Sequence, residues 1–193
     1  YGATPVTPGN LKSLLGDDLA TIAVLVLTGS IDARDFRTMR DEMPCLTRVE
    51  LSGVSIAAYT GTEGTFQGNN LTYPANAIPQ YAFYPPGSTT GNTSLRKIDL
   101  PASATTIGQY AFQLCHSLAA VRLPAALTSI ENAAFYGCTA MTALSLPATV
   151  KNIGRDAFFR FGGNILVDPA NPWFSDLEGV LMNKLQTLVI HCP

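Results

Sequence analysis

The chain has 193 residues, of which 47% are hydrophobic and 13% are charged, and its formal net charge is −2. This composition excludes a disordered tail, a coiled coil and a polar linker, and without a basic excess it disfavours nucleic acid and anionic membranes as partners. The longest apolar run, 22–27, is far shorter than the roughly 20 residues that cross a bilayer, so we expect no membrane-spanning segment.

Two short helices are predicted near the start of the chain. Asn10 can cap a helix that runs through Leu15 and ends at Gly16, because Asn accepts hydrogen bonds from free backbone amides and Gly adopts the conformation that ends helices. Asp32 can cap a second helix, which ends at Pro44. Its apolar face follows helical spacing at Ala33, Phe36, Met39 and Met43. We expect both helices to cover the open edge of the first strand.

Two strands of one pattern come next, followed by an insertion. Residues 22–27 and 46–51 both carry apolar side chains at spacings typical of a strand with one buried face. The next strand of this pattern begins only at Leu95, and an isolated Ile-x-x-x-Ala-Phe segment begins at Ile78. Gly, Asn, Thr, Pro and Tyr are frequent between Leu51 and Ile78. We therefore predict an ordered loop or hairpin there, not a helix.

Three copies of a 23-residue unit follow. Leu95, Leu118 and Met141 each begin an L-x-x-I-x-L-P type segment, which predicts a short strand that the proline ends. The second half of each unit turns the chain back, as a 3₁₀ turn, a single helical turn or a second short strand. Its apolar residues keep the same register, at Ile107, Ile130, Ile153, Ala111, Ala134, Ala157, Phe112, Phe135 and Phe158. Stacked units bury these side chains in continuous columns.

The chain closes with elements that depart from the repeat. Residues 163–169 predict a shortened strand, and residues 176–181 and 185–190 predict a hairpin joined at Asn183 and Lys184. No polar closing segment follows, so the chain is interpreted as a possible piece of a longer array.

The repeats resemble the BspA-like leucine-rich repeat family, whose unit reads L-x-x-I-x-L-P-x-x-(V/L)-x-x-I-G-x-x-A-F-x-x-C. Residues 95–117 and 118–140 match it closely, and 141–161 departs in having Phe161 where the unit ends in Cys. The second copy has Ser-Ile-Glu at 129–131 in place of Ile-Gly. The resemblance implies an α/β fold: a right-handed leucine-rich-repeat solenoid of mostly short parallel strands with turns or 3₁₀ segments and an N-terminal helical cap.

The resemblance also implies a domain organisation and a location. We expect one leucine-rich-repeat domain over 1–193, with a cap and first strand (1–45), an irregular repeat with an insert (46–94), three regular repeats (95–161) and a terminal strand and hairpin (162–193). The family implies export through a signal peptide absent from this chain, an extracellular or cell-surface location, and adhesion. It implies no catalytic residues and no cofactor.

Cysteine and histidine are too scattered to predict a metal or catalytic site. The cysteines are Cys45, Cys115, Cys138 and Cys192, and no CxxC pair occurs. Cys115 and Cys138 occupy equivalent repeat positions, which leaves a disulfide, a redox pair or buried filler open; Phe161 in the third copy favours filler. His116 is expected on the surface, and the acidic pairs at 17–18 and 41–42 are expected to be solvated. We therefore predict a non-enzymatic protein without metal or cofactor.

Two groups of residues are the candidates for partner contact. Outward strand positions carry Arg48, Lys97 and Arg122, and the insert supplies Tyr59, Phe66 and Tyr73, with Tyr81 and Tyr84 close in sequence. The alternatives are that the charges only solvate the sheet and that the aromatics only pack the insert onto the stack. We predict a monomeric surface module that binds a protein or glycan on host or neighbouring cells. A structural spacer of a longer surface protein is the alternative.

Overall fold

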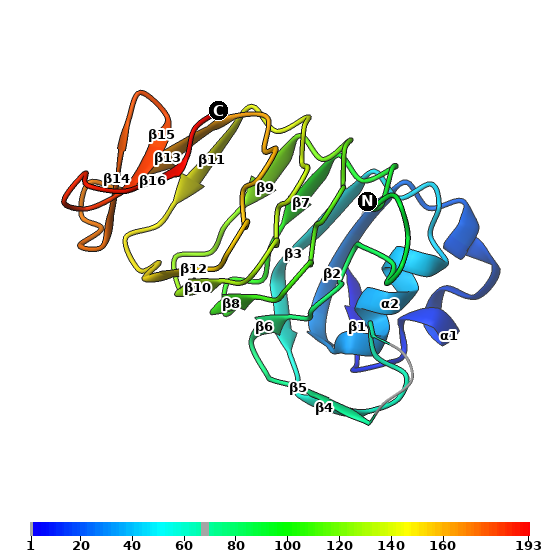
Figure 1. Ribbon diagram of the computed structural model, residues 1–193. Helices are drawn as coiled ribbons and strands as arrows, with labels where there is room; N and C mark the ends of the chain where they lie inside the picture. Colours follow the sequence, from blue (N-terminus) through cyan, green and yellow to red (C-terminus); the bar gives the residue numbers. More distant parts are fainter. Residues whose placement is uncertain (1, 67–69) are drawn as a thin grey trace.

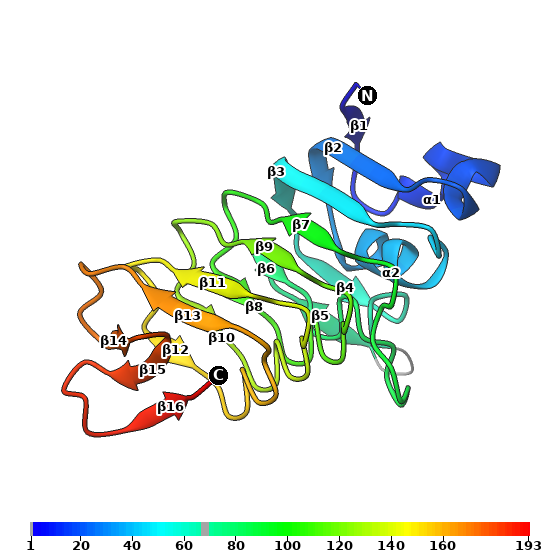
Figure 2. The same cartoon turned by 90° about the horizontal axis from the view of Figure 1, so that it is seen from above.

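Parallel strands from successive segments of the chain lie side by side along the molecule (Figures 1 and 2). The computed structural model describes residues 2–66 and 70–193. One sheet contains, in order, β1 (Thr4–Val6), β2 (Val24–Ile31), β3 (Arg48–Ile56), β7 (Lys97–Asp99) and β9 (Ala120–Arg122). The row continues with the parallel pair β11 (Ala143–Leu146) and β13 (Asn164–Val167). Ile98 pairs with Val121, so the register follows the 23-residue repeat.

A second row of two-residue strands follows the turn of each repeat. It contains β6 (Ala77–Ile78), β8 (Thr106–Ile107), β10 (Ser129–Ile130) and β12 (Asn152–Ile153), all parallel. Of the three conformations left open by the sequence, this segment adopts the short strand. Successive turns pack closely: a Cβ atom at Gly108 would lie 2.7 Å from the carbonyl oxygen of Ile78. Glycine therefore allows this close approach at position 108, whereas the next repeat has Glu131 at the equivalent position.

The core is one continuous apolar cluster that includes residues from Val6 to Leu181. The phenylalanines of the Ala-Phe segments form a column in which neighbouring ring centroids lie 5.4, 5.2 and 5.9 Å apart. The rings are stacked nearly parallel, and the column runs through Phe83, Phe112, Phe135 and Phe158. Each repeat therefore buries its ring mainly against its neighbours, and the stability of one unit depends on the next.

The N-terminal elements are α1 (Leu11–Leu15), the 3₁₀ helix η1 (Gly16–Ala20) and α2 (Ala33–Asp41). The structure corrects two expectations. Asn10 precedes α1, but its side chain accepts from the Thr7 amide instead of capping the helix. β1, which was not predicted, pairs along the edge of β2 that the helices were expected to cover.

Two carboxylates organise α2. Asp32 caps the helix as predicted, and Asp35 completes a capping box by accepting from the Asp32 amide. The Asp35 carboxylate also accepts from the amides of Gly9 and Leu11, at 2.7 and 3.0 Å. This buried side chain therefore joins the start of α1 to α2. It accepts from a free amide at the start of α1, which is the role predicted for Asn10.

The insert forms the expected hairpin, with β4 (Tyr59–Gly61) antiparallel to β5 (Leu71–Tyr73). α2 holds the chain at two points, one within the loop between β4 and β5 and one after β5. The side chain of Arg40, 2% exposed, donates from Nη1 to the carbonyl oxygens of Thr65 and Tyr81 at 2.7 and 2.8 Å. Its Nε lies 2.7 Å from a carboxylate oxygen of Asp41, which balances the buried charge.

The C-terminal segment forms the antiparallel sheet β14 (Phe174–Leu177), β15 (Val180–Asn183) and β16 (Val189–His191), at the far end from α1 (Figure 2). The predicted hairpin is partly corrected. β15 pairs with β16 through a longer loop than expected, and an additional turn at Glu178 and Gly179 joins β14 to β15. Gly179 has φ +87°, which glycine adopts without strain.

The four cysteines are unpaired, and two of them are buried. The Sγ atoms of Cys115 and Cys138 lie 3.6 and 3.1 Å from the carbonyl oxygens of Phe83 and Phe112. Burial raises the pKa of Cys115 to about 12 and raises that of Cys138 well above its usual value. Both thiols therefore stay protonated near neutral pH and fill the apolar slot predicted for them.

Thiol labelling tests this arrangement. We expect a water-soluble maleimide to modify Cys45 and Cys192, which are exposed, in the folded protein. All four cysteines should react after unfolding without reductant, because Cys115 and Cys138 become accessible only then. Mass spectrometry counts the adducts. Two adducts in the unfolded sample would show a disulfide and contradict the structure.

Candidate functional surfaces

Charged residues of three neighbouring strands share the outer side of the long sheet, here called the strand face. The parallel register sets Arg48 opposite Lys97, and it sets Glu50, Asp99 and Arg122 in one row across β3, β7 and β9. Arg48 and Arg122 are exposed. The three predicted basic residues therefore come together, because their strands are adjacent and their positions have the same parity.

Asp99 is the centre of this group. It is 3% exposed, and its carboxylate oxygens lie 3.5 Å from Lys97 Nζ and 3.5 Å from Arg122 Nε. A buried carboxylate requires such compensation. Lys97 and Arg122 thus pair with a carboxylate of this chain, which favours the alternative that these charges serve the sheet itself and not a partner. Arg122, whose side chain is 79% exposed, still presents most of its guanidinium to solvent.

Glu50 lies next to Asp99 across the strands. Burial acts to raise the pKa of Glu50, but hydrogen bonds from Ser52 and the nearby Arg48 charge outweigh it, and the pKa lies below its usual value. Glu50 is therefore a carboxylate at neutral pH. The strand face thus alternates basic and acidic groups at this end and carries the small side chains Ala120, Ala143 and Ser145 further along, followed on β13 by the exposed Asn164 and Leu166.

The insert aromatics face different neighbours. Tyr73 is 4% exposed, and its hydroxyl accepts from the Phe66 amide and donates to the Phe66 carbonyl oxygen. Tyr59 is half-buried beneath the Arg34 guanidinium, whose carbon lies 4.7 Å from the ring centroid. Its hydroxyl accepts from the Glu63 amide. These contacts favour the alternative that Tyr59 and Tyr73 pack the insert, and Tyr73 is not available to a partner in this structure.

Phe66 joins an aromatic group beside the turns of the repeats. Its ring centroid lies 5.2 Å from that of Tyr81, and Tyr81 lies 6.1 Å from Tyr84 and 5.0 Å from Tyr110. Burial among these rings raises the pKa of Tyr81. The structure therefore does not unite the insert with Arg48, Lys97 and Arg122: the insert contacts α2 and the turns, whereas the three basic residues lie on the strand face.

The turns carry a groove that the sequence analysis missed. Its volume is 460 Å³, and its lining includes Gln109, Tyr110, Gln113, Asn132 and Tyr136. The signal was present in the repeat itself, at the positions immediately before and after Ala-Phe. These positions change from copy to copy while the apolar columns do not.

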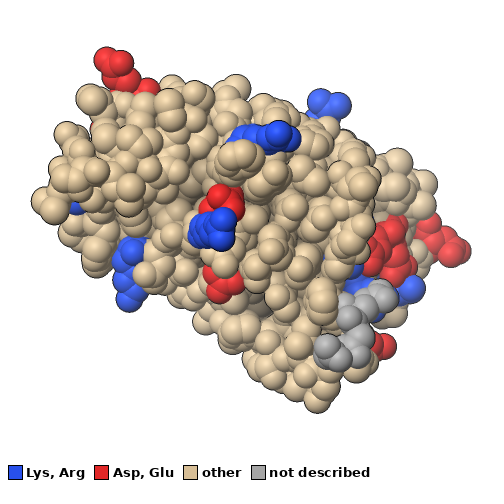
Figure 3. All heavy atoms as spheres, viewed as in Figure 1, with Lys and Arg blue, Asp and Glu red and all other residues tan. Residues whose placement is uncertain are grey.

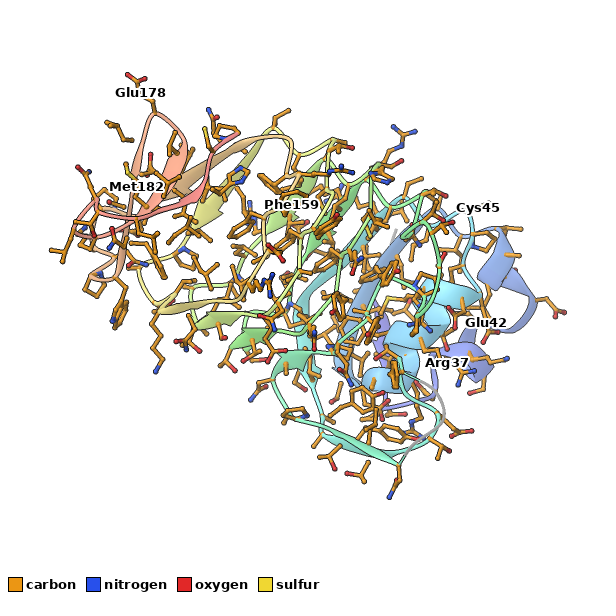
Figure 4. The ribbon with its side chains drawn as sticks, in the orientation of Figure 1. Arg37, Glu42, Cys45, Phe159, Glu178 and Met182 are labelled. Carbon is orange, nitrogen blue, oxygen red and sulfur yellow. The ribbon has the colours of Figure 1, made fainter. Side chains whose placement is uncertain are left out.

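The acidic pairs lie at the N-terminal end, where Figure 3 shows acidic atoms gathered and Figure 4 labels Glu42. Lys12 Nζ lies 2.9 Å from Glu42, and Asp41 pairs with Arg40. No group of three or more metal-ligating side chains occurs in residues 2–66 and 70–193. His116 is exposed beside the buried, protonated Cys115, so the two do not form a nucleophile and base pair. In the same residues, every helix is too short or too polar to span a bilayer.

Comparisons with known proteins agree with this architecture. Residues 76–163 match the BspA type leucine rich repeat region in six copies. The crystal structure of the pneumococcal vaccine antigen PcpA is similar at 20% identity and a TM-score of 0.51, over 98% of this chain and 40% of that protein. A leucine-rich cell surface protein from Faecalibacterium prausnitzii has 20% identity and a TM-score of 0.48, over 95% of this chain and 47% of that one.

A leucine-rich repeat protein from Bacteroides capillosus matches 63% of this chain and 76% of its own length, at 24% identity and a TM-score of 0.43. Comparison with curated protein sequences gave no match. The chain spans less than half the length of PcpA, and at this identity the likeness concerns the fold alone. The repeat region of this chain, residues 76–163, therefore belongs to the BspA-type leucine-rich repeat family.

Proposed function

We propose that this chain is a non-enzymatic recognition module at a bacterial cell surface, and that its strand face contacts a protein or glycan partner. The match to BspA-type repeats supports a binding role of the adhesion type. It also supports an exported, extracellular protein. The repeats form a rigid platform, because β1, β2, β3, β7 and β9 form one hydrogen-bonded sheet over a continuous apolar core, and a rigid platform loses little entropy when it binds.

The observation that carries the proposal is the polar group on β3, β7 and β9. Arg48 and Arg122 are exposed on either side of Asp99, whose charge is already compensated. Exposed arginines on a rigid sheet offer several hydrogen-bond donors in fixed positions, and arginine is enriched at binding hot spots. A partner surface with carboxylates fits these donors.

The finer architecture is part of the same proposal. We interpret the stacked repeats as a right-handed solenoid, with α1, η1 and α2 as its N-terminal cap and the division into 1–45, 46–94, 95–161 and 162–193 within one domain. We further propose that the module acts as a monomer and is exported through a signal peptide. Light scattering of the purified chain tests the monomer.

The binding role is tested with the triple variant Arg48→Ala, Lys97→Ala, Arg122→Ala. We expect binding to a partner captured from a panel of extracellular-matrix proteins to weaken about tenfold or more, since hot-spot truncations cost about 2 kcal/mol or more and about 1.4 kcal/mol corresponds to tenfold. Biolayer interferometry at constant ionic strength measures the affinity. The triple variant Lys12→Ala, Lys151→Ala, Lys184→Ala removes the same charge at exposed sites elsewhere and should bind as the wild type does.

A structural spacer is the second candidate, and the bare part of the strand face favours it. Ala120, Ala143 and Ser145 offer a partner little to hold. A spacer predicts that no protein or glycan in the panel binds the chain. If both triple variants bind the partner equally well, the contact does not involve the basic residues of the strand face.

A further inference from the structure

The turn face, defined as the loops that follow β6, β8, β10 and β12, carries two repeat-aligned rows of variable side chains. The row immediately before each Ala-Phe contains Tyr81, Tyr110, Ala133 and Asp156. The row immediately after contains Tyr84, Gln113, Tyr136 and Phe159. These positions are free to vary because the Ala-Phe pair between them supplies the buried contact. Figure 4 labels Phe159 near the middle of the molecule in this view.

Aromatic rings on the turn face form two separate groups. Tyr110 packs on Tyr81 at 5.0 Å between ring centroids, and Tyr136 packs on Phe159 at 5.3 Å. Ala133 and Gln113 lie between these two groups, at positions where the preceding repeat has a tyrosine, Tyr110 and Tyr84 respectively. The small side chain of Ala133 therefore opens the groove of 460 Å³ between Tyr110 and Tyr136. This volume lies within the range of small-molecule sites.

Polar groups along the groove have hydrogen-bonding capacity to spare. The Oε1 atom of Gln113 is buried without a hydrogen-bond partner in the described part of the chain. Asn132 uses its Oδ1 atom to accept from the Arg155 amide, which leaves its side-chain amide to donate. A buried amide oxygen without a partner is costly, so a bridging water at Gln113 is favoured, whereas the exposed Asn132 can donate directly to a ligand.

The charge of the groove is balanced. Arg155, the basic residue of the lining, has its Nε 3.4 Å from a carboxylate oxygen of Asp156. Nothing here resembles the basic cluster that phosphate, sulfate or nucleic acid requires. Two half-buried tyrosine rings and several amides suit a ligand with both apolar faces and hydroxyl groups.

The groove is also held in shape before any ligand binds. The Tyr110 amide donates to the Asn132 carbonyl oxygen at 3.1 Å, and the Ala133 amide donates to the Arg155 carbonyl oxygen at 2.9 Å. The Gln109 amide donates to the Glu131 carboxylate at 2.9 Å. These bonds join three successive repeats, so little ordering remains to be done on binding.

We propose that the turn-face groove is a binding site for a neutral oligosaccharide. The rings of Tyr110 and Tyr136 provide flat apolar surfaces for the C–H faces of sugar rings, the Asn132 side-chain amide donates to a sugar hydroxyl group, and Gln113 is reached through a bridging water. The proposal rests on the function proposed above, that of a recognition module, but it assigns a surface and a ligand class which are independent of the strand face.

An array of neutral oligosaccharides tests the proposal, with N-glycans, mucin-type O-glycans, glucans and mannans, and with sulfated glycosaminoglycans as a charged arm. The best neutral hit is then titrated by isothermal titration calorimetry. Ala133→Tyr should weaken binding at least about tenfold by filling the groove, and Tyr136→Ala should do so by removing one ring. Ala133→Tyr should fold, because the preceding repeat has Tyr110 at the equivalent position with nearly the same backbone angle: φ is 58° at Tyr110 and 52° at Ala133.

The melting temperature of each variant checks that it is folded, and two control variants test whether loss of binding is confined to groove residues. Tyr59→Ala removes a half-exposed tyrosine outside the groove, and Lys184→Ala alters an exposed residue near the C-terminal end; both should bind the oligosaccharide as the wild type does. Binding of only sulfated glycans, or undiminished binding by a folded Ala133→Tyr, would overturn the proposal. If no glycan binds but a matrix protein does, the groove proposal fails while the recognition function stands. If neither binds, both fail.

Discussion

Phe135→Ala is expected to lower the free energy of unfolding by about 3–5 kcal/mol, the largest effect of any single substitution proposed here. Phe135 has no exposed surface and stands in the middle of the phenylalanine column, 5.2 Å from Phe112 and 5.9 Å from Phe158 between ring centroids. Truncation removes apolar burial on both sides and leaves a cavity, because stacked repeats cannot collapse into it without shifting their hydrogen-bonded strands. Urea denaturation followed by circular dichroism measures the loss.

Phe159→Ala is the matched control. It removes the same kind of side chain from the residue that follows Phe158 in sequence and lies outside the column. Phe159 is 50% exposed and contacts Tyr136 and Arg160. Its loss should cost less than about 1 kcal/mol. A cost below about 1 kcal/mol for Phe135→Ala as well would show that the column is not the buried spine of the stack.

The second large effect is expected at Arg40, with a cost of about 2–4 kcal/mol for Arg40→Ala. The substitution leaves the carbonyl oxygens of Thr65 and Tyr81 without their donor and removes the closer of the two arginines that pair with Asp41. Because the Thr65 carbonyl lies in the loop of the insert hairpin and the Tyr81 carbonyl follows the hairpin, the insert should also detach from α2. Thermal unfolding gives the stability change, and limited proteolysis should show faster cleavage within 57–77.

Arg37→Ala tests whether the effect belongs to the buried guanidinium. Arg37 is on the same helix, its side chain is 34% exposed, and its Nε lies 3.6 Å from Asp41. An exposed ion pair of this kind contributes less than about 1 kcal/mol. Equal destabilisation and equal cleavage in the two variants would mean that Arg40 is not the anchor of the insert.

The repeat was predictable because its signal is redundant. Each copy places Leu, Ile and Phe at the same positions, so an error in one copy is corrected by the others, and the strands, the Phe column and the slot of Cys115 and Cys138 followed. The capping role of Asp32 was also visible, since capping depends on local sequence.

The structure of the N-terminal and C-terminal segments was harder to predict, because it depends on contacts between residues that are distant in sequence. β1 is only three residues long and is stabilised by pairing with β2, which local pattern does not reveal. Asn10 lost its capping role to Asp35, a residue 24 positions beyond the Leu11 amide that it binds. The C-terminal hairpins likewise depend on a positive φ at Glu178 and Gly179 and on pairing across three strands.

The candidate sites were likewise predictable where they follow the repeat and not where they depend on contacts outside it. Arg48, Lys97 and Arg122 were predicted together because strand parity and repeat register fix where they lie. The burial of Tyr73 was not predictable, since its hydroxyl bonds to the backbone of Phe66 within the insert. The turn-face groove was not predicted because it is lined by small and polar residues such as Ala133 and Gln113, which form no apolar or charged pattern in the sequence.

The most direct test of the recognition function is a ¹H–¹⁵N NMR titration of the 193-residue chain with a captured partner. The account predicts shifts confined to the strand face around Arg48, Lys97 and Arg122 for a protein, and to the turn-face groove around Gln113 and Ala133 for an oligosaccharide. Shifts confined to Trp173 and the β14–β16 sheet, or no shifts with any partner, would contradict it.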